Sequence, residues 1–326
     1  MLRILLADKL PESPLSALRS SGCEIRMDPS LAKEALVEAL AEFDPEVLVV
    51  RSTRVEKEQI EAAGRLRLIV RAGAGFNTID LSTASSRGIS VANCPGKNAT
   101  AVAELAWGHI LNADRRIADG VADLRAGQWR KKHYAKAAGI YGRTLGVLGC
   151  GSIGREVIAR GKAFGMNIVA LDPWLTPESA EALGVQQATD LADLARQSDV
   201  LTVHLALTPE TRGMVDATVF DALPPGAIFI NTSRGEVVDE AALCTAIREK
   251  GIRAGLDVYC DEPGTDGEWS TELSGMEGVY GTHHIGASTS QAQEAVAQEA
   301  CRILEIFDTT GEVVNCVNLD SLENRP

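Results

Sequence analysis

Short runs of valine, isoleucine and leucine alternate with helical patterns along the whole chain, and no other feature restricts the fold more. The runs predict strands at 2–7, 47–51, 67–71, 88–92, 144–149, 167–172, 199–203, 227–231 and 252–257. In the intervening segments, apolar residues recur at the spacing of a helix. Continuous apolar strands separated by helices are typical of parallel sheets that are covered on both faces. We therefore expect an α/β protein built from doubly wound parallel sheets.

The two longest helical patterns indicate where the chain passes between domains. A chain of 326 residues is too long for one core of ordinary size and fits two domains. The patterns at 98–119 and 288–308 each lie next to a strand-rich block. We therefore expect a discontinuous domain made of residues 1–97 plus 287–326, into which a second domain of residues 98–286 is inserted.

A glycine-rich motif, Gly149-Cys150-Gly151-Ser152-Ile153-Gly154, follows a predicted strand and opens a predicted helix. In a dinucleotide fold, such glycines allow a tight turn and close approach of the backbone to a pyrophosphate, and the helix N-terminus binds the anion. The next predicted strand ends at Asp172, which lies 18 residues after Gly154. An acid at about this spacing binds the ribose hydroxyls and repels a 2′-phosphate. The motif therefore predicts NAD rather than NADP, whereas the glycines alone would be explained by a tight turn.

Three chemically active side chains follow successive predicted strands further along the chain. Arg234 follows Asn231-Thr232-Ser233, Glu262 lies in the stretch Asp257 to Pro263, and His284 precedes Ile285-Gly286. Open α/β sheets bind ligands at the carboxyl ends of their strands. An arginine can bind a carboxylate, a histidine can exchange a hydroxyl proton, and an acid can orient the imidazole. Together they indicate carbonyl–alcohol redox chemistry, although a local salt bridge or cap would explain any one of them alone.

With these residues in place, the chain resembles the D-isomer-specific 2-hydroxyacid dehydrogenases, and most closely those that oxidise 3-phospho-D-glycerate. The matching stretches are 71–75, 98–105, 149–154, 231–240, 254–263 and 284–293. The resemblance implies a Rossmann NAD domain inserted into a flavodoxin-like substrate domain, and a homodimer built largely through the cofactor domain.

The resemblance also implies roles for particular residues. Catalytic roles are implied for Arg234, Glu262 and His284. Asp257 is implied to hold the nicotinamide carboxamide. Further cofactor contacts are implied for the small residues Thr232, Ser233 and Gly286, in addition to the glycine-rich motif and Asp172.

The sequence departs from the family pattern at several places. His283 stands where a proline usually precedes the catalytic histidine, so two adjacent histidines compete, and the residues that follow favour His284. Phe76 and Asn77 replace a small apolar residue and an aspartate. The sequence contains no counterpart of the regulatory domain found in longer family members. We therefore expect a short form without feedback by serine.

Positive charge is expected where a small anionic substrate binds. Arg51 and Arg71 match the family positions that serve the phosphate and carboxylate groups. The backbone of Ala72, Gly73 and Ala74 offers N–H groups for a carboxylate. For Arg54 and the basic run 130–132, a solvated surface is an equal alternative. Because the net charge of −13 repels anions overall, a local positive field has to attract the substrate.

Composition argues against several other classes of protein. The acidic charge and an aromatic content of 4% disfavour nucleic-acid binding. No apolar run reaches the roughly 20 residues that span a bilayer. The seven cysteines form neither CxxC pairs nor clusters with histidine, which argues against a zinc site or a disulfide framework and fits a cytoplasmic location.

The expected function is NAD-dependent oxidation of 3-phospho-D-glycerate to 3-phosphohydroxypyruvate, a step of serine biosynthesis, with a histidine as general base. Two alternatives remain open from the sequence. One is a hydroxypyruvate or glyoxylate reductase of the same family. The other is a non-enzymatic NAD-sensing protein that shares the fold, because a fold alone does not determine function.

Overall fold

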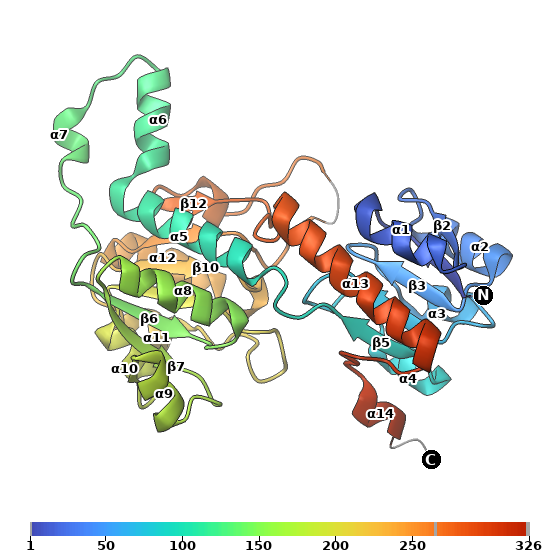
Figure 1. Ribbon diagram of the computed structural model, residues 1–326. Helices are drawn as coiled ribbons and strands as arrows, with labels where there is room; N and C mark the ends of the chain where they lie inside the picture. The colour runs from blue at the N-terminus through green and yellow to red at the C-terminus, as the bar shows by residue number, and fades with distance from the viewer. Residues whose placement is uncertain (1, 264–265, 324–326) are drawn as a thin grey trace. The chain divides into compact units, whose positions relative to one another are not determined.

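The computed structural model describes residues 2–263 and 266–323, which form two compact units (Figure 1). The first unit consists of Met1–Asn98 and Ser288–Pro326, and the second consists of Ala99–Ala287. Each unit contains one sheet in which all strand pairs are parallel. The expected α/β class with two doubly wound parallel sheets is therefore confirmed.

The first unit has five strands in the order β2-β1-β3-β4-β5, which is the flavodoxin-like order. The strands are β1 (Arg3–Leu6), β2 (Glu24–Met27), β3 (Val47–Val50), β4 (Leu68–Arg71) and β5 (Ser90–Asn93). One face packs on α1 (Glu12–Ser20) and α13 (Ser290–Thr310), and the other on α2 (Lys33–Phe43), α3 (Lys57–Ala62) and α4 (Leu81–Arg87). A short helix, α14 (Leu319–Glu323), follows.

Strand β3 shows why this sheet is buried on both sides. Its side chains alternate between the two faces, as in any strand. Val47 and Val49 belong to the apolar cluster under α1 and α13, whereas Leu48 and Val50 belong to the cluster under α2, α3 and α4. A strand with two covered faces requires a continuous apolar run, which is what the sequence has here.

The second unit has seven strands in the order β12-β11-β10-β9-β6-β7-β8. They are β6 (Thr144–Leu148), β7 (Asn167–Leu171), β8 (Gln186–Gln187), β9 (Val200–Val203), β10 (Ile228–Asn231), β11 (Arg253–Leu256) and β12 (Val279–Gly281). Counted from β6, this is the Rossmann order with β12 added at one edge. The helices α5 (Ala99–Arg115), α8 (Ser152–Ala163) and α9 (Pro177–Leu183) cover one face, and α10 (Leu191–Gln197), α11 (Ala217–Ala222) and α12 (Glu240–Lys250) cover the other.

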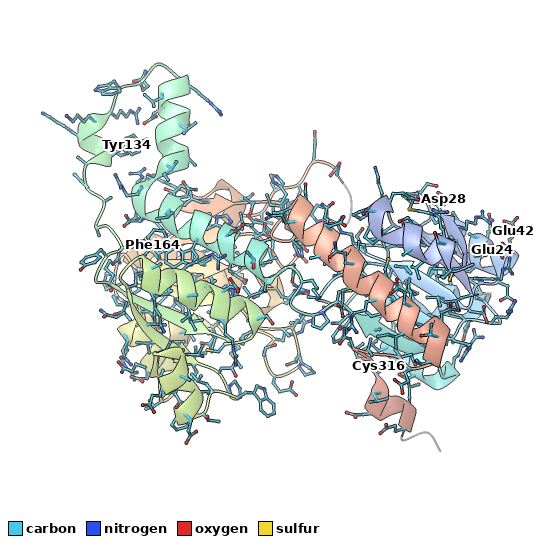
Figure 2. All side chains as sticks on the ribbon, viewed as in Figure 1. Glu24, Asp28, Glu42, Tyr134, Phe164 and Cys316 are labelled. Atoms are coloured by element: carbon cyan, nitrogen blue, oxygen red, sulfur yellow. The ribbon has the colours of Figure 1, made fainter. Side chains whose placement is uncertain are left out.

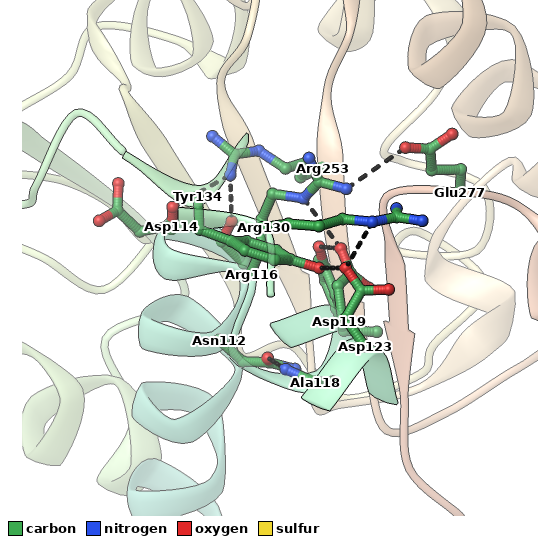
Figure 3. Close-up of polar contacts among 12 residues, drawn as sticks. Asn112, Asp114, Arg116, Ala118, Asp119, Asp123, Arg130, Tyr134, Arg253 and Glu277 are labelled. Atoms are coloured by element: carbon green, nitrogen blue, oxygen red, sulfur yellow. Dashed lines mark hydrogen bonds and ion pairs between the residues drawn. The ribbon is translucent and has the colours of Figure 1, made fainter. Parts of the chain in front are cut away.

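The prediction of a single helix over 98–119 is wrong, because the segment contains a break between two helices. Helix α5 ends at Arg115, and Arg116 adopts a left-handed conformation with φ of 55°. A new helix, α6 (Ile117–Arg125), then begins, and Asn112 Oδ1 accepts the N–H of Ala118 at its start, 2.8 Å away (Figure 3). The apolar spacing continues through the break, so the sequence pattern does not reveal it.

After this break, residues 117–137 form an arm that contains α6 and α7 (Lys131–Tyr134) and extends away from the sheet of the second unit (Figure 1). Polar contacts hold its base (Figure 3). Asp119 accepts hydrogen bonds from Arg116 and from the hydroxyl of Tyr280, each at 2.9 Å. The Tyr134 side chain reaches from α7 to α6, where its hydroxyl donates to Asp123 at 2.6 Å (Figure 2).

Candidate active site

The glycine-rich motif forms the turn between β6 and α8, and each of its glycines has a structural reason. A Cβ at Gly149, where φ is 96°, would lie 2.6 Å from the carbonyl oxygen of His204. A Cβ at Gly154 would lie 2.0 Å from the carbonyl oxygen of Gly149. A Cβ at Gly151 would have no heavy atom within 4 Å. The first and third glycines therefore permit close packing of the backbone, and the second borders open space that a ligand can approach.

The first turn of α8 provides donors for an anion. Gly151 is the N-cap, and Ser152 and Ile153 are the first helical residues. The N–H groups at a helix N-terminus have no partner within the helix and favour negative charge. Arg155, which sequence reasoning did not single out, donates from Nε to the carbonyl of Cys150 at 3.0 Å and holds the turn.

Asp172 lies directly after β7 and is already bonded to the backbone. Its Oδ2 accepts the N–H of Cys150 at 2.7 Å, and its Oδ1 accepts the N–H of Trp174 at 2.8 Å. The side chain is half-buried. Because each carboxylate oxygen can accept more than one hydrogen bond, these contacts fix the carboxylate beside the turn and leave it able to accept others.

Two polar atoms that follow strands of this sheet are buried and lack a partner among residues 2–263 and 266–323. They are Oγ1 of Thr232, which follows β10, and Nδ1 of His204, which follows β9. Burying a polar atom without a hydrogen bond costs about 1–3 kcal/mol, so a bound polar group there is favourable. The open space at Gly151, the N-terminus of α8 and the unpartnered Oγ1 of Thr232 together fit a dinucleotide.

Arg234 is positioned by the turn that follows β10. Asn231 Oδ1 accepts the N–H of Ser233 at 3.0 Å and its hydroxyl at 2.7 Å, while Asn231 Nδ2 donates to the carbonyl of Arg234 at 2.9 Å. Burial lowers the pKa of the Arg234 guanidinium, and the charges of Glu262 and Glu236 oppose that shift. An arginine stays charged even so, and a buried cation next to acids is suited to bind an anion.

The turns after β10 and β11 are packed against each other. A Cβ at Gly235 would lie 2.1 Å from the carbonyl carbon of Tyr259. Only a glycine allows this approach. This close packing brings the segment of Arg234 against the segment that leads to Glu262. The proximity explains why the charge of Glu262 opposes the lowering of the pKa of the arginine by burial.

His284 and Glu262 form a close pair. Nδ1 of His284 lies 2.6 Å from Oε1 of Glu262. Because a carboxylate only accepts, Nδ1 carries the proton and donates it, which leaves Nε2 of a neutral ring with its lone pair free to accept one. The neighbouring His283 is exposed and forms no hydrogen bond or ion pair with any residue that the structure describes.

The backbone of His284 is in the left-handed region, with φ of 54°. For a residue other than glycine this costs of order 1–3 kcal/mol and persists only where neighbouring contacts impose it. Asp257, which is 1% exposed, supplies such contacts. Its carbonyl accepts the N–H of His284 at 2.8 Å, and its carboxylate accepts the N–H groups of Ile285 at 2.9 Å and Gly286 at 2.8 Å.

In the first unit, Arg51 and Arg71 lie at the same edge of the sheet, because Val50 of β3 is paired with Arg71 of β4. Asp8 accepts the backbone N–H groups of Arg51 at 2.6 Å, Ser52 at 3.1 Å and Thr53 at 3.1 Å. Burial alone raises the pKa of Asp8, but these hydrogen bonds outweigh it and the pKa is lowered. The carboxylate therefore fixes the start of the Arg51 loop.

The backbone nest expected at Ala72, Gly73 and Ala74 is only partly present. The N–H of Ala72 donates to the carbonyl of Val50 at 2.7 Å, and that of Gly73 to the carbonyl of Arg71 at 2.8 Å. These two groups are therefore occupied, which corrects the expectation for them. The Arg71 guanidinium lies over the loop, since a Cβ at Gly73 would be 1.5 Å from its Nη1. The arginine itself is the main source of positive charge here.

In residues 2–263 and 266–323, no group of three or more histidine, cysteine or acidic side chains is arranged to hold a metal ion. All seven cysteines in this described part are free thiols. None of its helices is long and apolar enough to pass through a membrane.

Comparison with known proteins gives consistent matches. Residues 107–286 match the family model for the NAD binding domain of D-isomer specific 2-hydroxyacid dehydrogenases. The chain is 40% identical over 325 residues to D-3-phosphoglycerate dehydrogenase of Methanocaldococcus jannaschii, which covers 98% of this chain and 60% of that protein. It is 42% identical over 283 residues to hydroxypyruvate reductase of Thermotoga maritima, which covers 86% of this chain and 89% of that protein.

Among solved structures, NAD+-bound 3-phosphoglycerate dehydrogenase of Entamoeba histolytica matches with a TM-score of 0.80 and 27% identity, over 97% of this chain and 98% of that one. The chain spans only about 60% of the length of the first curated relative. The similarity therefore covers the two α/β units and not the remainder of that relative.

Proposed function

The chain belongs to the D-isomer specific 2-hydroxyacid dehydrogenase family, and we propose that within it the protein oxidises 3-phospho-D-glycerate to 3-phosphohydroxypyruvate with NAD, as in serine biosynthesis. The observation that carries the dehydrogenase chemistry is the bonded pair of His284 and Glu262, because the turn that leads to Glu262 packs against that of Arg234. The names of several relatives, including proteins of Methanocaldococcus jannaschii and Mycobacterium leprae, support this choice of substrate.

Proton transfer falls to His284. In the oxidative direction its free Nε2 accepts the proton of the substrate hydroxyl, and the ring becomes an imidazolium. The carboxylate of Glu262, which accepts from Nδ1, stabilises the positive charge that develops. In the reverse direction the imidazolium returns the proton to the oxygen. The chemistry that bound NAD supplies is acceptance of a hydride from C2.

Arg234 has the complementary role. A guanidinium can bind the substrate carboxylate through two parallel hydrogen bonds and polarise the adjacent C2 oxygen. Because the group is partly desolvated, its contact with an anion is stronger than it would be in water.

In the second unit we assign NAD to the glycine-rich turn. Gly151, Ser152 and Ile153 would hold the pyrophosphate, on a turn whose shape Gly149 and Gly154 permit, and Asp172 would accept from the ribose hydroxyls. Further contacts are assigned to Thr232, Ser233, Asp257 and Gly286. The unpartnered Oγ1 of Thr232 supports this assignment, because it is buried and needs a donor or acceptor.

In the first unit we assign substrate binding to Arg51 and Arg71. The phosphate and carboxylate of phosphoglycerate are both anionic. Arg51 follows β3 and Arg71 is the last residue of the neighbouring strand β4, so both lie at one edge of the sheet. Charge-assisted hydrogen bonds from arginine to such groups are among the strongest in proteins.

A second candidate is hydroxypyruvate or glyoxylate reduction, which the 42% identity to the Thermotoga maritima hydroxypyruvate reductase favours. These substrates lack a phosphate. The third candidate is an NAD-sensing protein without turnover. It predicts that NADH binds while no 2-oxo acid is reduced.

A panel of 2-oxo acids tests these readings. Purified protein is mixed with NADH and, separately, with 3-phosphohydroxypyruvate, hydroxypyruvate, glyoxylate or 2-oxoglutarate, and loss of NADH absorbance is followed. The highest kcat/KM is expected for 3-phosphohydroxypyruvate. A preference for hydroxypyruvate or glyoxylate supports the second candidate instead, and NADH binding without any turnover supports the third.

We further propose that the protein is a cytoplasmic homodimer. Apolar side chains on the arm support self-association, since Ile117, Val121, Leu124 and Trp129 are 51%, 40%, 59% and 80% exposed. Sedimentation equilibrium of the wild type and of Leu124→Asp tests this. A dimeric wild type and a weakened variant are expected, and a monomeric wild type refutes the assignment.

A further inference from the structure

His109 lies on α5, and nothing above gives it a role. The residue is 4% exposed. Its Cβ occupies the place beside β11 where a side chain on Gly255 would come within 2.6 Å. The ring is thus fixed against the sheet at a point where the strand has no side chain. Its Nε2 lies 3.1 Å from Oγ1 of Thr282, a residue that follows β12.

The single proton of the Thr282 hydroxyl determines the direction of these hydrogen bonds. Thr282 Oγ1 lies 2.6 Å from Oδ1 of Asp257, a carboxylate that also accepts two backbone N–H groups. Thr282 therefore donates to Asp257 and has only a lone pair left for His109. His109 must donate from Nε2, so the neutral ring is the Nε2–H tautomer. Burial lowers the pKa of His109, which agrees with a neutral ring, and the charge of Asp257 opposes that shift.

These hydrogen bonds end at the segment that carries His284. The carboxylate of Asp257 accepts the N–H groups of Ile285 and Gly286, and its carbonyl accepts that of His284. They thereby impose the left-handed backbone of His284. A continuous path of hydrogen bonds thus connects α5 with the residue to which we assign proton transfer.

We propose that His109 is a positioning residue for His284. By donating from Nε2, it fixes the hydroxyl of Thr282 on Asp257, and Asp257 in turn holds the backbone of residues 284–286. The importance of this role for turnover rests on the proposed function, but the effect on the backbone does not.

A neighbouring cavity explains why the donor matters. A cavity of about 470 Å³ is lined by residues that include His109, Asn112, Asp119, Tyr280 and Thr282. It is large enough for several water molecules. Without His109, water in this cavity can compete for the Thr282 hydroxyl, which can then rotate away from Asp257.

Three variants test the proposal. His109→Leu removes the donor and keeps a buried side chain of similar size. His109→Gln keeps an N–H group at the end of the side chain. Ile110→Val, at the fully buried neighbouring position on α5, is the control for a small loss of packing.

Two measurements are made on each full-length variant. The first is steady-state kinetics with NADH and 3-phosphohydroxypyruvate. We expect His109→Leu to lower kcat about fivefold, as for loss of one hydrogen bond, while the KM for NADH changes less than about twofold. The second is amide hydrogen exchange at Ile285 and Gly286, which we expect to become at least about fivefold faster in His109→Leu. His109→Gln should restore most of both values, and Ile110→Val should change neither.

The proposal is wrong if His109→Leu leaves the exchange at Ile285 and Gly286 unchanged. It is also wrong if His109→Gln or Ile110→Val accelerates this exchange as much as His109→Leu does, since packing would then be the cause. If the wild type turns over none of the 2-oxo acids, the proposed function fails, and the exchange measurement still decides the role of His109 by itself.

Discussion

The stability of the second unit should depend on pH through His204, whose ring is held in the neutral form. Its Nε2 lies 2.9 Å from Oγ1 of Thr202, and its Nδ1 is sealed from solvent. Part of the residue reaches solvent, but Nδ1 is buried and Nε2 is engaged by Thr202, so a protonated ring would be poorly hydrated at either nitrogen. Burial lowers the pKa of His204 to about 3.

The direction of the pH effect on stability follows from which state, folded or unfolded, binds the proton. In the unfolded chain a histidine has a pKa of about 6.5, so below that pH the unfolded state takes up a proton that the folded state refuses. The free energy of unfolding is therefore unaffected at high pH and falls as the pH drops through 6.5 toward the folded pKa. Each pKa unit is worth about 1.4 kcal/mol, so between pH 7 and pH 5 the loss is about 2 kcal/mol.

Urea unfolding at both pH values measures this loss. All four tryptophans (107, 129, 174 and 269) lie in the second unit, so their fluorescence reports on the unit that contains His204. His204→Gln has no titrating ring and should lose about 2 kcal/mol less stability than the wild type between pH 7 and pH 5. His133→Gln removes an exposed histidine and should behave like the wild type. If His204→Gln loses as much stability as the wild type between pH 7 and pH 5, burial does not hold His204 in the neutral form.

The remaining predictions concern the cofactor, the substrate and the proton. Replacing Asp172 by Ser should narrow the preference for NAD over NADP, because repulsion of the 2′-phosphate disappears; equal kcat/KM of the wild type with both cofactors contradicts this. Arg51→Ala should raise the KM for the phosphorylated substrate about tenfold or more, as expected for one charge-assisted contact, while Arg54→Ala, which removes an exposed charge from the same loop, should have little effect. His284→Ala should lower kcat by about a hundredfold or more with NADH binding retained, and His283→Ala should be much milder; the reverse order in the two kcat values shows that the assignment of the catalytic histidine is wrong.

The sequence-based prediction missed three strands of the described chain, and all three are edge strands. β2, β8 and β12 lie at the ends of their sheets and are partly exposed. β2 reads Glu-Ile-Arg-Met, and β8 consists of two glutamines. A strand with a neighbour on one side only, and with solvent near it, does not require the continuous apolar run by which the inner strands were recognised.

In the candidate site, the sequence indicated the reactive residues but not the contacts that position them. Arg234, Glu262 and His284 could be selected from the sequence because residues at successive strand ends converge on one edge of a parallel sheet. The contact of His109 with Thr282 could not be predicted, because it joins positions 173 residues apart and depends on how α5 is rotated against β11 and β12. The left-handed backbone of His284 also has no local signal, since neither glycine nor asparagine marks the position.

An aspartate at the end of a strand can organise the neighbouring turn, contact a ligand, or do both. Asp8, Asp172 and Asp257 follow β1, β7 and β11, and each accepts backbone N–H groups of a nearby turn. A short carboxylate at the end of a parallel strand reaches such groups readily, so it can organise the neighbouring turn whether or not it also contacts a ligand. For Asp172 and Asp257, replacement by asparagine would therefore loosen a turn in addition to removing the cofactor contact that we propose, because the amide offers one accepting oxygen in place of two. The loss of turnover on such a replacement measures both effects, and only amide exchange in the adjacent turn can separate them.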